Sequence, residues 1–226
     1  SIIVSAIREG RKIIDNIKKT IVFMVSECFS EIVLIVGCIL FGVPIFILPV
    51  QILWENLIEG SPQGISLAFE PEEEHIMKRK PENPKAPLFD SLMKDIVFKF
   101  GILTDIILFF IGLALYRNGM PIEEVRTFCF VGLALSSLCY GFSCKNLRKS
   151  IWNYNIFSNK WLNLSILFGW IMIILAVYNP FLQTVLKTIP LPLKDWVLLA
   201  LLGITQVLLI EWIKYIHINK KQIWKK

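Results

Sequence analysis

The sequence predicts an all-α, polytopic membrane protein, a bundle of six transmembrane helices preceded by an amphipathic stalk helix. The first observation is composition: 55% of the 226 residues are hydrophobic, only 19% are charged, and the mean hydropathy is +0.61. The second is length, because most of the apolar runs are as long as a helix that crosses a bilayer. The predicted spans are residues 22–41, 45–69, 96–116, 127–142, 161–178 and 196–216.

Basic residues provide the third observation, because they gather in alternate connections. Lysine and arginine are concentrated in residues 8–19, 78–99, 145–160 and 214–226, and are sparse between these clusters. The positive-inside rule then places both termini and two loops in the cytoplasm, as an even number of spans requires. Topology therefore accounts for the net charge of +6. We expect an integral, multi-pass protein of the plasma membrane, with the lipid bilayer and not nucleic acid as its partner.

Residues 1–20, SIIVSAIREGRKIIDNIKKT, combine isoleucines and charged residues at a mostly helical period, which predicts an amphipathic helix. One interpretation is a helix that lies on lipid. The other is a stalk that runs directly into the first span and couples it to a cytoplasmic domain. The chain starts without an initiator methionine, so we expect a fragment of a longer protein. We divide it into a stalk segment (1–20) and a transmembrane domain (21–226) with a cytoplasmic loop at 70–95.

The first span carries two acids, Glu27 and Glu31, which lie one helical turn apart and so on one face. Ionisable groups at hydrocarbon depth are costly and usually face a protein interior or an ion pathway. Glu31 is the deeper of the two, and we expect it to bind a cation. Glu27 lies closer to the cytoplasmic interface and is a secondary candidate. The alternative is a protonated carboxyl group that is hydrogen-bonded to a neighbouring helix.

The second span holds an amide and two more acids, in the stretch QILWENLIEGSPQG. A helical period of about 100° per residue places Glu55, Asn56 and Glu59 on one side of this span. A short turn joins the first two spans, so these side chains can meet Glu31 across the hairpin. Carboxylate, amide and carbonyl oxygens suit hard cations such as Ca²⁺, and the chain has no thiolate–imidazole set suited to Zn²⁺. The predicted metal ligands are therefore Glu31, Asn56 and Glu59, with Glu55 as a secondary candidate.

Gly60 and Pro62 follow these polar residues directly. Glycine and proline at membrane depth allow a helix to unwind and to turn carbonyl oxygens towards a bound cation. We therefore expect the second span to unwind at these two residues.

Later spans add weaker candidates for the ion path. Asp105 lies in the third span, and Ser136 and Ser137 lie in the middle of the fourth. Small hydroxyl residues inside a membrane also serve as helix-packing contacts, so the two serines have this alternative role. The charged, proline-rich loop after residue 70 is either a solvated linker or a docking loop for a cytoplasmic domain.

The chemistry of soluble enzymes has no counterpart in this chain. The sequence has no P-loop, no HExxH motif, no nucleophile elbow and no dinucleotide fingerprint. We therefore predict no catalytic residue within these 226 residues.

Four stretches resemble the C-terminal transmembrane region of P-type cation-transporting ATPases, most closely the calcium-pump-like group. They are REGRKIIDNIKKTI, SECFSE, LPVQILWENLI and LAFEPEEEHIMKRKPENPKAPLF. Weaker similarity continues through FSNKWLN and IPLPLKDW, so the resemblance covers essentially the whole chain. It implies that the six spans are the last six of about ten. Phosphorylation and nucleotide-binding domains, which use ATP and Mg²⁺, would then lie upstream, and the parent protein would be a cation translocase.

The resemblance also carries residue roles. Glu31 falls on the family's ligand glutamate in the first of these spans, and Asn56 falls on its ligand asparagine in the second. Glu59 would have to replace the family's ligand aspartate, because the chain is one residue shorter here. Cys28 stands where calcium pumps usually carry an asparagine, and Ser136 or Ser137 where some members carry a glutamate. These departures imply one ion per cycle or a different ion.

The functional hypothesis is therefore the ion-binding transmembrane domain of an ATP-driven cation pump, with Ca²⁺ as the favoured ion and phosphorylation of upstream domains as the driving event. One alternative is a stand-alone, six-span secondary transporter in which Glu31 and Glu59 relay protons or sodium. Another is a membrane scaffold that transports nothing, in which the acids are neutral and bonded between helices.

Overall fold

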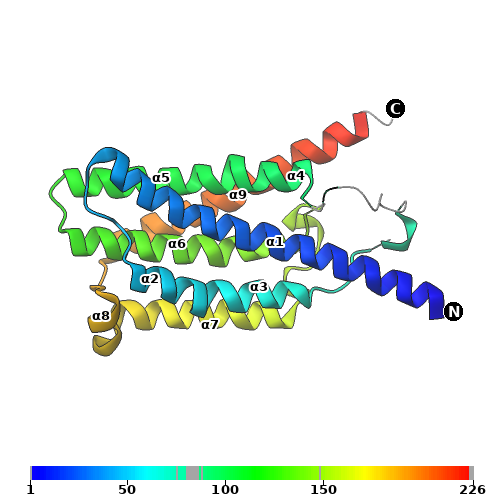
Figure 1. The fold of residues 1–226 in the computed structure, drawn as a ribbon, viewed down its shortest axis with the longest axis horizontal. Coiled ribbons are helices and arrows are strands. Elements are labelled where there is room, and N and C mark those ends of the chain that lie inside the picture. Colours follow the sequence, from blue (N-terminus) through cyan, green and yellow to red (C-terminus); the bar gives the residue numbers. More distant parts are fainter. Residues whose placement is uncertain (1, 75, 80–86, 88, 148, 224–226) are drawn as a thin grey trace.

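The computed structural model describes residues 2–223 except 75, 80–86, 88 and 148. Within these residues every regular element is a helix, and the elements form one elongated bundle (Figure 1). Five helices of the described chain are long and apolar enough to cross a membrane: Ile2–Phe41, Ser91–Arg117, Ile122–Cys144, Lys160–Tyr178 and Leu193–Ile216. The predicted class, an all-α polytopic membrane protein, is confirmed.

Helix α1 (Ile2–Phe41) contains both the predicted stalk and the first predicted span. Its 40 residues form one uninterrupted helix, about 60 Å long at 1.5 Å per residue, and its first half projects beyond the bundle (Figure 1). In this half Ile13 and Ile17 are exposed, whereas Asp15 and Lys19 are buried against the loop that follows residue 70. Asp15 and Lys19 therefore face protein, and α1 runs without a break from the predicted stalk segment into the first predicted span.

The second predicted span is a helical path of mixed geometry. After a turn at Gly42, whose φ of 64° favours glycine, helix α2 (Pro49–Trp54), the π-helix η1 (Glu55–Gly60) and helix α3 (Ser61–Ala68) follow without a break. This path is not among the five apolar helices, because its polar residues lower its mean hydropathy. It runs beside α1 and is about 30 Å long, which is the thickness of a bilayer core.

The π-helical turn has a cause in the sequence. Pro62 has no backbone N–H for the carbonyl of Ile58, and its ring would press on that carbonyl in a regular α-helix. The turn widens instead, and the N–H of Ser61 donates to the carbonyl of Asn56, five residues back. The Ser61 hydroxyl donates to the same carbonyl at 2.6 Å. The expected unwinding at Gly60 and Pro62 is thus absent from this structure, and a widened but closed helix takes its place.

The remaining elements complete the bundle. Helix α4 (Ser91–Lys94), the π-helix η3 (Asp95–Gly101) and helix α5 (Ile102–Arg117) form the next path, followed by α6 (Ile122–Cys144), α7 (Lys160–Tyr178), the short α8 (Pro180–Leu186) and α9 (Leu193–Ile223). Three short 3₁₀ helices lie in the connections: η2 (Ile76–Lys78), η4 (Ile151–Asn153) and η5 (Ile156–Ser158).

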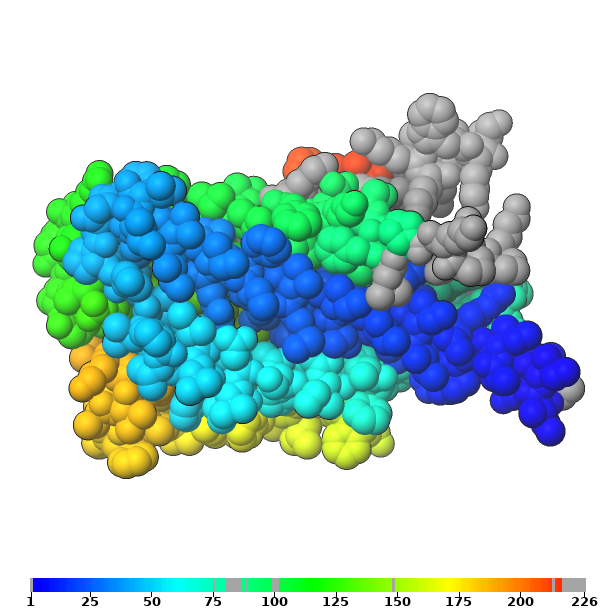
Figure 2. Space-filling view, viewed as in Figure 1, coloured from blue at the N-terminus to red at the C-terminus, as the bar shows by residue number. Residues whose placement is uncertain are grey.

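Helix α6 is the centre of the bundle. It packs against α1, α3, α5, α7 and α9, and most of its apolar side chains are buried. Close packing depends on glycine: a Cβ added to Gly132 would lie 2.6 Å from a methyl group of Leu108 on α5. Helices α1 and α3, in contrast to the buried α6, lie side by side on one face of the molecule (Figure 2). Residues on those two helices can therefore face either α6 or the outside.

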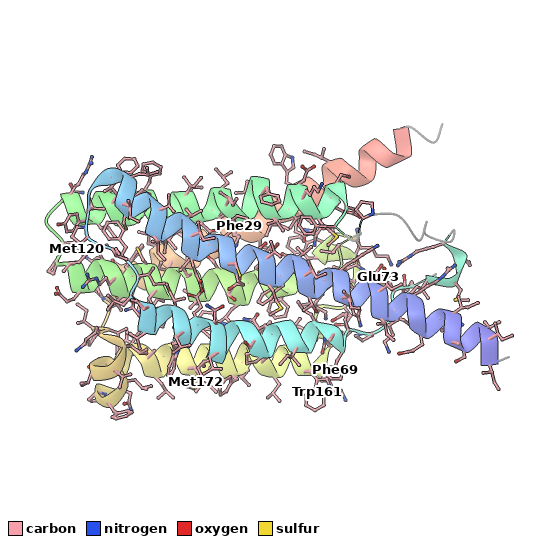
Figure 3. All side chains as sticks on the ribbon, in the orientation of Figure 1. Phe29, Phe69, Glu73, Met120, Trp161 and Met172 are labelled. Carbon is pink, nitrogen blue, oxygen red and sulfur yellow. The ribbon has the colours of Figure 1, made fainter. Side chains whose placement is uncertain are left out.

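Both termini lie at one end of the bundle, here called the termini end; the turn at Gly42 and α8 lie at the opposite end (Figure 1). Buried ion pairs at the termini end join α1 to the segment after α3. Arg79 contacts Asp15 and Glu73 at 2.5 Å each, and Lys19 contacts Glu73 at 3.3 Å. Figure 3 labels Glu73 beside α1. The amide nitrogen of Asn16 donates to the carbonyls of Ala68 (3.0 Å) and Glu70 (2.8 Å), so α1 is held to the end of α3.

A second junction at this end joins α3, α6 and α7 through Glu70. Asn159 caps α7 by accepting from the N–H groups of Trp161 and Leu162, and its amide nitrogen donates to Glu70 Oε2 at 2.9 Å. Glu70 Oε1 lies 3.7 Å from Lys145 Nζ, which is fully buried. Burial raises the pKa of the Glu70 carboxyl, although Asn159 and Lys145 oppose the change. Burial also lowers the pKa of Lys145.

Candidate cation site

Glu31 of α1 and Asn56 of η1 are in direct contact. The Asn56 amide nitrogen donates a hydrogen bond to Glu31 Oε1 and also to the carbonyl of Ile52 at 3.0 Å. Glu31 lies two residues after Phe29, which Figure 3 labels on α1. Asn56 is exposed and Glu31 is half-buried, so this pair opens onto the outer face of the bundle. The structure therefore brings two of the three predicted ligands together.

Glu59, the third predicted ligand, faces the interior. Its side chain has no exposed surface, and neither carboxylate oxygen has a hydrogen-bond partner among the described residues. Glu55, one turn earlier, is also buried, and its Oε2 is likewise unpartnered. Buried carboxyl oxygens without partners are costly, so these three oxygens are the clearest sign of a binding site among the described residues.

The predicted common side of Glu55, Asn56 and Glu59 is only partly correct. Glu55 and Glu59 share the inner face, whereas Asn56 points outwards. Consecutive residues on a helix differ by about 100°, so Glu55 and Asn56 cannot both face α6. The site consequently has an outer part, Glu31 with Asn56, and an inner part, Glu55 with Glu59.

The secondary candidates Glu27 and Asp105 lie around the inner part. Asp105 on α5 is buried, and its Oδ2 accepts a hydrogen bond from the hydroxyl of Ser30 at 2.7 Å. Glu27 on α1 lies near enough to Asp105 and Glu31 for their charges to interact. Glu55 interacts in the same way with all of these acids. Five carboxyl groups from three helical paths therefore share the middle of the bundle.

The two serines of α6 differ. Ser137 is buried, within reach of the Glu27 carboxyl, and its hydroxyl lies 3.3 Å from the amide nitrogen of Gln63. Ser136 is only partly buried. Ser137 therefore belongs to the inner part of the site, and Ser136 is at its edge.

These acids do not form a closed metal centre by themselves. Among the described residues no three histidine, cysteine, aspartate or glutamate side chains are grouped closely enough to hold a metal ion. The donor atoms are nevertheless the carboxylate, amide and hydroxyl oxygens that hard cations use. A bound cation would need the acids to move closer together or would need further oxygen ligands.

Gln63 and Tyr140 are buried members of this region that sequence reasoning missed. Gln63 lies one turn after Glu59 on the same face, a spacing that would have drawn attention to it. Tyr140 on α6 shares a hydrogen bond of 2.8 Å with Ser26 on α1, and no pattern in the sequence indicates this contact. Both residues tie α6 to the two helices that carry the candidate ligands.

Comparisons with known proteins identify the family of this helical membrane domain. Residues 44–216 match the family described as "Cation transporting ATPase, C-terminus". A "Calcium-transporting ATPase 1" of Bacillus cereus is 35% identical and is matched over 95% of this chain and 26% of its own length. A "Probable cation-transporting ATPase F" of Mycobacterium tuberculosis is 31% identical over 85% of this chain and 21% of its own. The orangutan (Pongo abelii) "Calcium-transporting ATPase type 2C member 1" is 29% identical over 99% of this chain and 24% of its own.

The class is thus an integral, multi-pass, helical membrane domain. More narrowly, the chain belongs to the family of C-terminal regions of cation-transporting ATPases, as the resemblance in the sequence implied. It spans about a quarter of the length of the curated relatives that it matches. These relatives do not favour the alternative of a stand-alone secondary transporter.

Proposed function

We propose that this chain is the ion-binding transmembrane part of an ATP-driven cation pump, and that Ca²⁺ is the cation it moves. The observation that carries the proposal is Glu59, a fully buried carboxyl group whose two oxygens have no partner among the described residues. It lies on the same π-helix as Asn56, which bonds to Glu31. The names of the relatives, calcium-transporting and cation-transporting ATPases, support the same class of cargo.

In this proposal Glu31, Asn56 and Glu59 bind the cation through oxygen atoms. The acids around them, Glu27, Glu55 and Asp105, supply negative charge along the path. When the cation leaves, the carboxylates take up protons, because several charged acids in a low dielectric are unfavourable. Glu55, Asn56 and Glu59 all lie on the π-helix η1, a geometry that occurs often at functional sites.

In this proposal the outer part of the site, Glu31 with Asn56, is covered by further protein and not by lipid. Asn56 is exposed and Glu31 is half-buried, at a depth where the rest of the bundle surface is apolar. The further transmembrane helices of a longer pump would lie against this face and could add backbone carbonyl ligands. The phosphorylation and nucleotide-binding domains, with ATP and Mg²⁺, would belong to the rest of that longer pump. The termini end would then be cytoplasmic, and α1 would transmit movement from those domains.

The test is the ATPase activity of the full-length gene product in the presence of a panel of cations. We expect Ca²⁺ to stimulate turnover, and we expect Glu31→Gln and Glu59→Gln to raise the half-stimulating concentration at least tenfold, the effect of losing about 1.4 kcal/mol of binding free energy. Glu123→Gln is the matched control, because Glu123 is an exposed acid at the opposite end of α6. Failure of every cation to stimulate turnover would refute the pump. Normal Ca²⁺ dependence of both site variants would refute the site, and the scaffold hypothesis would then account for the buried acids.

A further inference from the structure

Gln63 on α3 carries a buried oxygen that the fold leaves unused. Its side chain has no exposed surface. The amide nitrogen donates to the Glu59 carbonyl and to the Ser137 hydroxyl, each at 3.3 Å. The amide oxygen, Oε1, has no hydrogen-bond partner among the described residues. A buried amide oxygen without a partner is unfavourable, and an apolar side chain of the same size would avoid that cost.

Gln51 shows what a purely structural glutamine looks like in the same helical path. It is as completely buried as Gln63. Its oxygen accepts the N–H of Leu48 at 2.9 Å, and its nitrogen donates to the carbonyl of Leu186 at 3.0 Å. Both ends of Gln51 are therefore satisfied by the fold. Gln63 differs because its Oε1, the atom that can bind a cation, has no hydrogen-bond partner among the described residues.

The position of Gln63 places its amide among the inner acids. It follows Glu59 by one turn and so lies on the same face. Its partner Ser137 is within reach of the Glu27 carboxyl, whose charge also acts on Glu59. The oxygen itself fills space that Gly141 of α6 leaves open, because a Cβ on Gly141 would lie 2.5 Å from Oε1. The amide is thus held between α3 and α6, next to the unpartnered oxygens of Glu59.

We propose that Gln63 is a further ligand of the cation site, whose amide oxygen coordinates the cation beside Glu59 while Ser137 positions the amide nitrogen. The inference rests on the proposed pump function. A neutral oxygen at this point completes the coordination of a divalent cation without adding another acid to a cluster of five. Hard cations accept such amide oxygens together with carboxylates.

The experiment measures Ca²⁺-stimulated ATPase activity and thermal stability of the full-length protein for four variants. Gln63→Met removes the oxygen at nearly constant volume and should raise the half-stimulating Ca²⁺ concentration about tenfold or more, with little change in the melting temperature. Gln63→Glu keeps an oxygen at the same reach and should retain most of the wild-type affinity. Gly141→Ala displaces the amide oxygen without removing a ligand and should weaken Ca²⁺ stimulation.

Gln51→Met is the matched control. It breaks hydrogen bonds of 2.9 and 3.0 Å, whereas Gln63→Met breaks two longer ones of 3.3 Å and removes an unpartnered buried oxygen. Gln51→Met should therefore lower the melting temperature more than Gln63→Met does, while leaving the half-stimulating Ca²⁺ concentration near that of the wild type. If Gln63→Met leaves that concentration unchanged, or if Gln63→Glu loses as much affinity as Gln63→Met, the assignment of Gln63 is overturned. The outcomes separate the two proposals. If Ca²⁺ does not stimulate the wild type, the pump is overturned. If Glu59→Gln lowers the Ca²⁺ affinity and Gln63→Met does not, only the role of Gln63 is overturned.

Discussion

The side-chain amide of Asn56 donates to the carboxylate of Glu31 across two neighbouring helical segments, on a face of the bundle where Asn56 is exposed. A polar contact of this kind at hydrocarbon depth is stable only if other groups or an ion complete it. In the proposed pump, these two residues would mark the side of the bundle against which its further helices lie.

Replacement of Asn56 tests this contact. Asn56→Ala removes an oxygen ligand and the donor that orients Glu31, so we expect the half-stimulating Ca²⁺ concentration of the full-length protein to rise about tenfold or more. Asn118→Ala, an exposed asparagine in the turn before α6, should leave it unchanged. Equal effects of both variants would show that Asn56 has no special role.

Pro62 is predicted to set the rotation of Glu59. Pro62→Ala restores a backbone N–H that can bond to the carbonyl of Ile58, so the π-turn should contract to an α-turn and rotate the preceding residues. We expect lower Ca²⁺ affinity in the ATPase assay without loss of thermal stability. Pro49→Ala, at the first turn of α2 where no N–H partner is required, is the control. A normal Ca²⁺ dependence in Pro62→Ala would mean that the π-turn does not position Glu59.

Lys145 is predicted to stabilise the termini end. Lys145→Met leaves Glu70 buried without its cation and also removes a hydrogen bond to the hydroxyl of Ser158. We expect a loss of about 3 kcal/mol in unfolding free energy, measured by denaturation in detergent. The double variant Lys145→Met/Glu70→Gln should lose less than the sum of the two single variants, because it removes both charges of one buried pair. Strict additivity would contradict the pairing.

Glu70 should also make stability depend on pH. Because burial raises the pKa of Glu70 above its ordinary value of 4.5, the folded state binds this proton more readily than the unfolded state. Its contribution to stability is then fully present below pH 4.5 and is lost as pH rises through the raised pKa. The stability of the wild type relative to Glu70→Gln should therefore increase on acidification from pH 7, measured as melting temperature in detergent. A difference that does not vary with pH would contradict this sign.

Hydropathy predicted much of this fold, because long apolar helices have few alternatives in a bilayer. Helix α6 runs from Ile122 to Cys144 and so extends beyond both ends of the predicted fourth span, 127–142. Burial of Lys19 and Asp15 could not be predicted, because their partners Glu73 and Arg79 lie about 60 residues away in a loop. Local pattern carries no information about such contacts.

The sequence was enough to predict which acidic residues belong to the candidate site. It was not enough to predict how their side chains are arranged. The contact between Glu31 and Asn56 follows from a hairpin with a short turn. The π-turn does not follow from a uniform helical period, and it decides where Glu59 points. Gln63 escaped attention because glutamine is an ordinary residue in a sequence, and only its burial and its unpaired oxygen distinguish it.

Helix α1 is unbroken, and Asn16 divides it into two arms at the point where α1 is hydrogen-bonded to the end of α3. Ile2 lies 14 residues before this point and Glu31 lies 15 residues after it, so the two arms are each about 22 Å long. In the proposed pump, a movement imposed on the first arm would therefore reach Glu31, and its contact with Asn56, through one unbroken helix.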